Sequence, residues 1–198
     1  MHRIFSTDAG FNLVTLCLLT WAAAAQTVTP AAPPGMAGHY FYRDDMAGFN
    51  FRTERARVGP LLDRLLWASE QPAPPSFYAG SVAAADFMPG FLADHRLPLD
   101  TPGATPRMWI GNDSHIATHF DQSDNVAVVV SGVRRFVLFP PEQVANLYLG
   151  PLNKTPAGQP VSMVAVDDPD LARYPRFAGA MEAAQVATLG PGDAIFIP

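Results

Sequence analysis

The sequence predicts a mainly β domain with a few helices packed on its outside. Three observations favour this class. Segments with the alternation of strands follow one another from residue 105 to residue 198. Twenty prolines divide the chain into short elements joined by turns. One clear amphipathic helix is expected over residues 58–66, where apolar residues recur at intervals of three and four. Many short strands joined by turns are typical of a β-sandwich or barrel.

The composition sets limits on the class of protein. The chain has 198 residues, enough for one domain with a substantial core, and 48% of them are hydrophobic, which argues against wholesale disorder. The net charge of -5 and the lack of a Lys/Arg-rich run disfavour broad contact with a nucleic-acid backbone, although a local basic groove stays open. Cys17 is the only cysteine, so any metal site must use His and carboxylate ligands.

Residues 1–37 are expected to form a helix-and-loop segment before the main domain, which we place at 38–198. The run 11–26 is apolar but too short for a confident membrane span, and a buried helix leading into the strand "QTVTP" is the favoured interpretation. A secretory signal is the alternative, because Arg3 precedes the run and "AAAAQ" ends it, but Asp8 counts against this. We therefore expect a cytoplasmic protein, with export as the alternative.

The remaining elements are expected in chain order. Before residue 105 there should be a strand and loop at 38–51, the helix, a short strand at 76–81, and no strong periodic element over 82–104. Beyond it, strands are expected at 105–111, 114–121, 125–132, 134–141, 160–167, 186–189 and 194–198, and short helices at 140–148 and 177–185. We expect a hairpin at Ser131–Gly132–Val133 and a turn at "GPGD", in which Asp193 stabilises its own backbone.

The stretch "ATHFDQSDN" contains the pair of residues with the clearest chemical meaning. His119 and Asp121 are two apart, and alternating residues of a strand point to the same side, together with His115 and Ala117. One more His would complete the set of two imidazoles and one carboxylate that binds non-haem Fe(II) and leaves positions open. Alone, this pattern is weak, because a His near an Asp on a β surface is more often a hydrogen-bonded pair.

The surrounding motifs add a resemblance. The run "WIGNDSHIATHFDQSDNVAVVVSGVRRFVLFPPEQ" is followed by "DDPDLARYPRF" and "LGPGDAIFIP", and preceded by "HYFYRDDMAGFNF" and "FYAGS". Together, over residues 38–198, these resemble the cupin-like JmjC family and its bacterial branch. The family consists of Fe(II)- and 2-oxoglutarate-dependent oxygenases related to the asparaginyl hydroxylase that inhibits hypoxia-inducible factor. The resemblance implies a double-stranded β-helix, also called a jelly roll.

The resemblance also implies roles for single residues. It puts iron on His119 and Asp121, and the far carboxylate of 2-oxoglutarate on Arg134, fifteen positions past the His. The best-known members have Lys there, but Arg can hold a carboxylate by two parallel hydrogen bonds if its longer fork is accommodated. Tyr78 and Asn125 match residues of the co-substrate pocket. Tyr78 can equally be read as a core tyrosine, and Asn125 as a turn cap.

A third metal ligand is expected from the family just after "IP", where this sequence stops at Pro198. The simplest expectation is therefore a fragment that binds Fe(II) weakly through two ligands and turns over little. The other histidines do not fill the gap. His115 would lie about 13 Å from His119 by strand rise. His39 and His95 are expected to be surface or structural residues.

The function expected from the resemblance is hydroxylation of a protein or peptide side chain, without a membrane. A small molecule or RNA as substrate stays open. One alternative is a cupin-fold protein that binds a metal or small ligand without oxygen chemistry. A second is a non-catalytic interaction module, which could form a homodimer through an exposed barrel edge.

Overall fold

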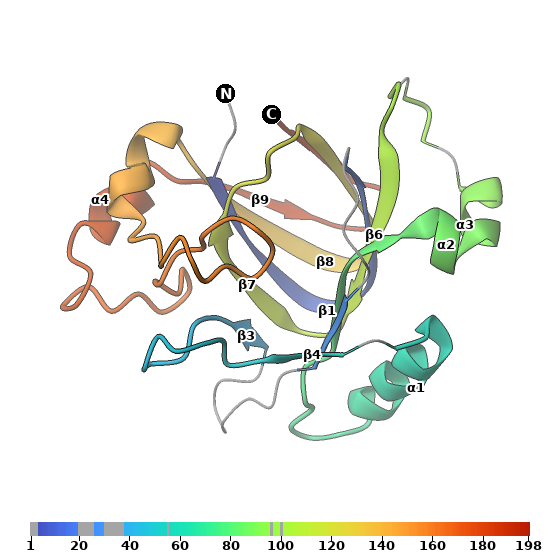
Figure 1. Ribbon diagram of the computed structural model, residues 1–198. Helices are drawn as coiled ribbons and strands as arrows, with labels where there is room; N and C mark the ends of the chain where they lie inside the picture. Colours follow the sequence, from blue (N-terminus) through green and yellow to red (C-terminus); the bar gives the residue numbers. More distant parts are fainter. Residues whose placement is uncertain (1–3, 20–25, 30–37, 55, 96, 100) are drawn as a thin grey trace.

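The computed structural model describes residues 4–19, 26–29, 38–54, 56–95, 97–99 and 101–198 (Figure 1). The strands are β1 (Ile4–Leu19), β2 (Gln26–Thr29), β3 (His39–Tyr40), β4 (Arg52–Glu54), β5 (Tyr78–Ala83), β6 (Thr105–Gly111), β7 (Ser114–His119), β8 (Asn125–Phe139), β9 (Gln185–Leu189) and β10 (Ala194–Ile197). The helices are α1 (Val58–Ser69), α2 (Ala84–Phe87), α3 (Pro89–Asp94), the 3-10 helix η1 (Pro141–Asn146) and α4 (Phe177–Glu182).

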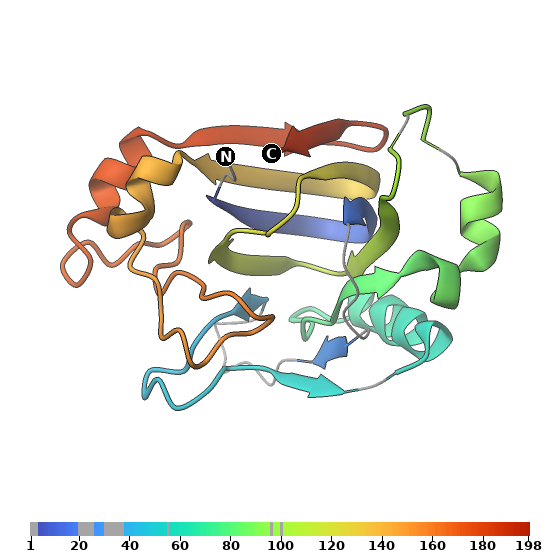
Figure 2. The ribbon, with the colours of Figure 1, turned by 45° about the horizontal axis from the view of Figure 1, so that its top comes forward.

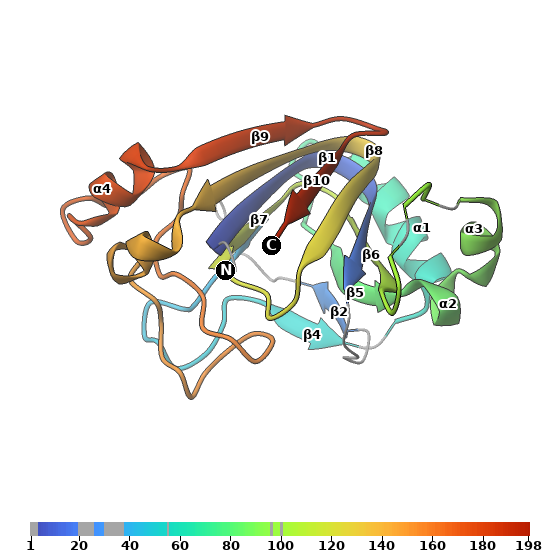
Figure 3. The ribbon, with the colours of Figure 1, turned by 90° about the horizontal axis from the view of Figure 1, so that it is seen from above.

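The strands join in one sheet with the order β10-β8-β1-β6-β5-β2-β4. Off this path, β7 pairs with β1 and β3, and β9 pairs with β8. Figure 2 shows the centre of the sheet as neighbouring bands, from red (β9 and β10) through gold (β8) to blue (β1). In Figure 3 the helices α1, α2 and α3 gather at one end and α4 at the other. This strand-rich architecture with few helices fits a jelly-roll fold.

The N-terminal segment differs from the sequence prediction. A 16-residue strand, β1, occupies Ile4–Leu19, where a helix was expected from residue 11. It pairs with β8 along one side and with β6 and β7 along the other. Periodicity alone does not separate a buried strand from a buried helix in an apolar run, and here the hydrogen-bonding edges of its neighbours decide. The strand expected at "QTVTP" is confirmed as β2, while residues 20–25, including most of "AAAAQ", lie outside the described residues.

The predicted hairpin at Ser131–Gly132–Val133 does not form. A single 15-residue strand, β8, runs through these positions. Gly132 has a φ of 80°, and the register with β1 shifts at this point, so the strand is irregular there and then continues. β1 continues beside both halves of β8, so the ladder extends through the bend instead of closing on itself.

Helix α1 forms as predicted and covers part of the sheet. Leu61 and Leu65 are buried and pack with Met108 and Ile110 of β6. Their spacing of four places both on one face of the helix. Burying one such leucine stabilises the fold by roughly 1.5–3 kcal/mol.

Alternate residues of β8 divide between two apolar clusters. Phe136 and Leu138 pack with Ile197 of β10, whereas Val137 and Phe139 pack with residues of α4. We call the side of the sheet that carries Phe136 and Leu138 the inner face, and the side beneath α4 the outer face. This distinction decides which of the candidate site residues can meet.

Three smaller predictions have different outcomes. The strand expected at 160–167 is wrong, because this segment forms a loop with one isolated bridge, Leu149 to Ser162. Residues 82–104, where no element was expected, contain α2 and α3. The turn at "GPGD" is confirmed: Asp193 Oδ2 accepts a hydrogen bond of 2.8 Å from the Gly190 N–H, and Gly192 has a φ of 90°.

Candidate functional site

His119 is the last residue of β7, and its ring is fixed by its own strand. The Nδ1 atom lies 2.7 Å from the carbonyl oxygen of Ala117. A carbonyl oxygen can only accept, so Nδ1 is the protonated nitrogen and Nε2 carries the lone pair. This is the tautomer in which a histidine presents Nε2 to a metal ion.

Asp121 follows in the turn after β7 and is held from another segment. The side-chain Nε2 of Gln159 donates a hydrogen bond of 3.2 Å to its Oδ1. Gln159 belongs to the loop between η1 and α4. A carboxylate oriented in this way by a neighbouring amide has the surroundings that metal-binding carboxylates commonly have.

The strand β7 contains a bulge, which overturns the simple alternation predicted for it. His119 lies opposite Phe5 of β1, but Ile116 lies opposite Thr7. Three residues of β7 therefore span the interval of two in β1, so one extra residue is inserted. His115 and His119 were predicted to share one face, and the extra residue places them on opposite faces of the sheet.

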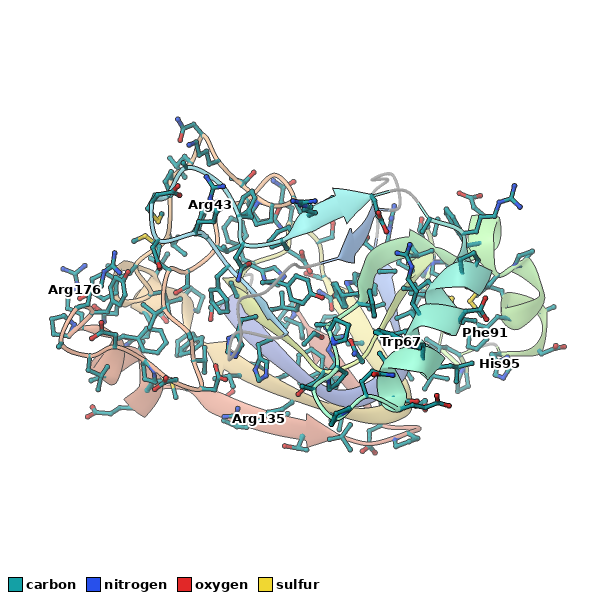
Figure 4. All side chains as sticks on the ribbon, turned by 90° about the horizontal axis from the view of Figure 1, so that it is seen from below. Arg43, Trp67, Phe91, His95, Arg135 and Arg176 are labelled. Atoms are coloured by element: carbon teal, nitrogen blue, oxygen red, sulfur yellow. The ribbon has the colours of Figure 1, made fainter. Side chains whose placement is uncertain are left out.

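The register through β1 shows which face each histidine occupies. Phe5 lies opposite both His119 and Leu138, so these two residues are on the same, inner face. His115 lies level with Arg135 by the same construction, on the outer face. Figure 4 shows Arg135 at the outer margin of the molecule, directed away from the sheet, as the sequence predicted.

Arg134 lies on the inner face with the candidate metal strand. Only 7% of the residue is exposed, and its guanidinium carbon lies 5.1 Å from the ring centroid of Phe136. A buried guanidinium is costly unless it meets an anion or polar groups. Its position at the inner face makes it a fitting anchor for the carboxylate of a small ligand.

Asn125 and Tyr78 lie on other parts of the sheet. Asn125 is buried at the start of β8 and pairs with Ile197 in β10, so it is a strand residue rather than a cap in an exposed turn. Tyr78 begins β5 opposite Gly111 and is half-buried. In the sheet order, β1 and β6 separate β5 from β8.

The surroundings of Tyr78 are tightly packed. Its ring centroid lies 5.6 Å from that of Tyr40, whose hydroxyl is 2.9 Å from Ser76 Oγ. Burial raises the pKa of Tyr40, so this residue stays neutral at ordinary pH. A Cβ added at Gly111 would lie 3.0 Å from Cδ2 of Tyr78, so glycine permits the close approach of β5 and β6.

The structure also assembles three residues that the sequence did not bring together. His39 of β3 lies opposite His115 of β7 in the parallel pair, and their rings stack at 4.3 Å. The Oδ2 atom of Asp167 is 3.7 Å from Nε2 of His39 and 3.3 Å from Nδ1 of His115. No local motif links these positions, and only the long-range β3–β7 pairing could have revealed them.

Comparison with known proteins agrees with the resemblance. The profile of the cupin-like domain family matches residues 17–198. The chain belongs to this family. The match to the cupin-like domain begins inside β1 and includes all of the candidate site residues described above.

Relatives of this cupin-like domain are proteins with JmjC names. The chain is 35% identical over 91 residues to the lysine-specific demethylase JMJ31 of Arabidopsis thaliana, covering 46% of this chain and 16% of the relative. It is 38% identical over 81 residues to human tRNA wybutosine-synthesizing protein 5, covering 41% and 23%. It is 29% identical over 136 residues to JmjC domain-containing protein F of Dictyostelium discoideum, covering 56% and 29%. The chain thus spans less than a third of the length of these relatives.

None of the helices in the described part of this cupin-like domain has the length and apolar character needed to cross a membrane.

Proposed function

We propose that this cupin-like domain is an Fe(II)- and 2-oxoglutarate-dependent oxygenase domain that hydroxylates a protein or peptide side chain. The observation that carries the proposal is the inner face shared by His119 and Arg134. One presents a ring nitrogen with the tautomer of a metal ligand, and the other a buried cation for a carboxylate.

The residues present fit the metal and the co-substrate. His119 Nε2 and a carboxylate oxygen of Asp121 are the imidazole and carboxylate donors that suit Fe(II). By the register, Arg134 is four residues along and two strands across from His119, which is roughly 16 Å between Cα atoms on a flat sheet. Two side chains pointing inward from a curved sheet, with a small dicarboxylate between them, would span this separation.

The protein's own part in the reaction is to position and to shield. When bound, Fe(II) with 2-oxoglutarate supplies the activation of O₂ for hydroxylation. Arg134 would hold the far carboxylate by two N–H donors and so fix the orientation of the keto acid. Phe136 and Leu138 line the same face and would keep water away from this pocket. Asn125, buried beside them on β8, would add a polar contact to the co-substrate, and we assign Tyr78 the same role from β5.

The charge of the chain favours a protein or peptide substrate over RNA. Among the relatives, one is named a lysine-specific demethylase and another a tRNA-modifying protein, so both substrate classes occur among them. This chain has a net charge of -5, and binding to a nucleic-acid backbone depends on Lys and Arg contacts. A polypeptide substrate has no such requirement.

The test is anaerobic titration of the 198-residue chain with Fe(II) and then with 2-oxoglutarate. Chelation of Fe(II) by a keto acid gives a visible charge-transfer band. We expect His119→Ala and Asp121→Ala to abolish iron binding. Arg134→Met, which keeps length and removes charge, should keep iron binding but lose the band at moderate 2-oxoglutarate. Arg134→Lys should restore part of it.

The matched controls are His95→Ala and Arg135→Met. His95 is exposed at the end of α3, where it stacks on Phe91 with ring centroids 4.2 Å apart (Figure 4). Neither control should change either signal, and circular dichroism should show that every variant is folded. Iron binding without any 2-oxoglutarate band, together with no succinate in air, would instead support a cupin-fold metal-binding protein without oxygen chemistry. Iron binding that survives His119→Ala would refute the assignment.

A further inference from the structure

A second cluster of metal-ligating side chains lies on the opposite face of β7 from His119. It consists of His39 from β3, His115 from β7 and Asp167 from the loop between η1 and α4. We propose that these three residues bind a divalent first-row transition-metal ion such as Zn²⁺. This site is separate from the one formed by His119 and Asp121 and is additional to the proposed function.

The distances match those of a metal site with small adjustments. One nitrogen or oxygen atom from each of the three residues lies within 4.8 Å of the other two. Metal–ligand bonds of about 2.0–2.2 Å in tetrahedral geometry place neighbouring ligand atoms roughly 3.4 Å apart. The carboxylate oxygen of Asp167 is already 3.3 Å from His115 and 3.7 Å from His39. A modest rotation of the stacked rings would bring the two imidazole nitrogens to the same spacing.

A second carboxylate supports the proposal independently. Asp113 Oδ1 lies 3.8 Å from Nε2 of His115, the ring nitrogen that does not face Asp167. A ligating histidine commonly turns its other nitrogen toward a carboxylate, which fixes the tautomer and strengthens the ligand. Two carboxylates around two neutral imidazoles also complement a double positive charge.

The backbone holds both histidines in place. The N–H of His115 donates a hydrogen bond of 2.6 Å to the carbonyl of Gly38, and Asn50 Nδ2 donates one of 2.7 Å to the carbonyl of His39. Gly38 has a φ of 86°, and a Cβ there would lie 2.8 Å from the carbonyl oxygen of Asp113. Glycine at this position therefore permits β3 to approach β7 closely enough for the two rings to meet.

Electrostatics favour a metal over a simple ion-pair cluster. The two rings stack with centroids 4.3 Å apart and planes 7° apart, so two imidazolium ions here would repel each other. The single Asp167 carboxylate can offset only one of those charges. A metal ion binds both rings in their neutral form. The side chains of His39, His115 and Asp167 are 17%, 22% and 30% exposed, so an ion can enter and keep water in its remaining positions.

The experiment removes the other metal site first. The background is the full 198-residue chain with His119→Ala and Asp121→Ala, stripped with chelator. Zn²⁺ binding is measured by calorimetry, and Co²⁺ binding by its visible spectrum. We expect one Zn²⁺ per chain and a cobalt spectrum of low coordination number. Adding His39→Ala or Asp167→Asn should weaken Zn²⁺ binding at least about tenfold, and Asp113→Asn should weaken it by about tenfold.

His95→Ala in the same background is the matched control and should leave affinity unchanged. Asp167→Asn keeps the shape of the side chain, so it tests the site even if His39→Ala disturbs β3. Circular dichroism checks the fold of each variant. The proposal is overturned if the background protein binds no stoichiometric Zn²⁺, or if a folded Asp167→Asn variant binds it as tightly as the background does. Loss of iron chemistry at His119 would leave this outcome unaffected.

Discussion

Gln159 should control iron binding although it is not a proposed ligand. Its amide donates a 3.2 Å hydrogen bond to Asp121 Oδ1, and the residue is partly buried. A hydrogen bond to a charged group contributes about 1.5–3 kcal/mol, and the length of this one favours the lower part of the range. Gln159→Ala should therefore weaken Fe(II) binding by roughly 10- to 30-fold, since about 1.4 kcal/mol corresponds to a factor of ten.

The assay is anaerobic Fe(II) titration of wild-type and variant chains, with thermal unfolding of the metal-free proteins in parallel. Gln143→Ala is the matched control, because Gln143 accepts a hydrogen bond from Asn146 in η1, away from the loop that carries Gln159. We expect both metal-free variants to unfold close to the wild-type temperature, and only Gln159→Ala to lose iron affinity. An unchanged iron affinity in Gln159→Ala would show that this bond does not orient a metal ligand, and the reasoning would fail.

Three further predictions concern stability. Gly111→Ala should destabilise the domain in urea unfolding, because the new Cβ would lie 2.8 Å from the backbone oxygen of Phe77; an unchanged midpoint would contradict the close approach of β5 and β6. Leu61→Ala should cost about 2–5 kcal/mol in the same measurement, since it leaves a cavity beneath α1. Burial raises the pKa of Tyr40 above its ordinary 10.0, so the stability it contributes is fully present below pH 10 and is lost as pH rises above it. Tyr40→Phe should therefore lose less stability than wild type between neutral and strongly alkaline pH, and equal alkaline losses would refute this.

Local pattern was enough to predict the elements whose side chains alternate between core and solvent. Helix α1 was predicted from the spacing of its leucines, and β6 and β7 from alternation and turn residues. His119, Asp121 and Arg134 were identified from motif resemblance, and the structure places His119 and Arg134 on one face. Their roles in binding iron and 2-oxoglutarate stay predictions.

The failures have one physical origin, which is pairing between distant segments. The strand β1 was expected to be partly helical because its apolar run carries no decisive period, and its edges are satisfied by β6, β7 and β8. The same pairing carries β8 through Gly132 instead of closing a hairpin. The bulge in β7 is defined only against β1, so the sequence could not show that His115 and His119 face opposite ways. His39 meets His115 through a pairing of segments 76 residues apart (115 minus 39).

The loop between η1 and α4 connects the two candidate sites. It supplies Gln159 to Asp121 on one side and Asp167 to His115 on the other. It has little secondary structure of its own and is docked by single bonds, including one of 2.8 Å from the N–H of Ser162 to the carbonyl of Thr118. Because that carbonyl belongs to the residue just before His119, the loop is fixed to β7 between the two sites. A metal ion at His115 would thus tether the same loop that orients Asp121, so occupancy of the outer site should favour the arrangement that the inner site needs.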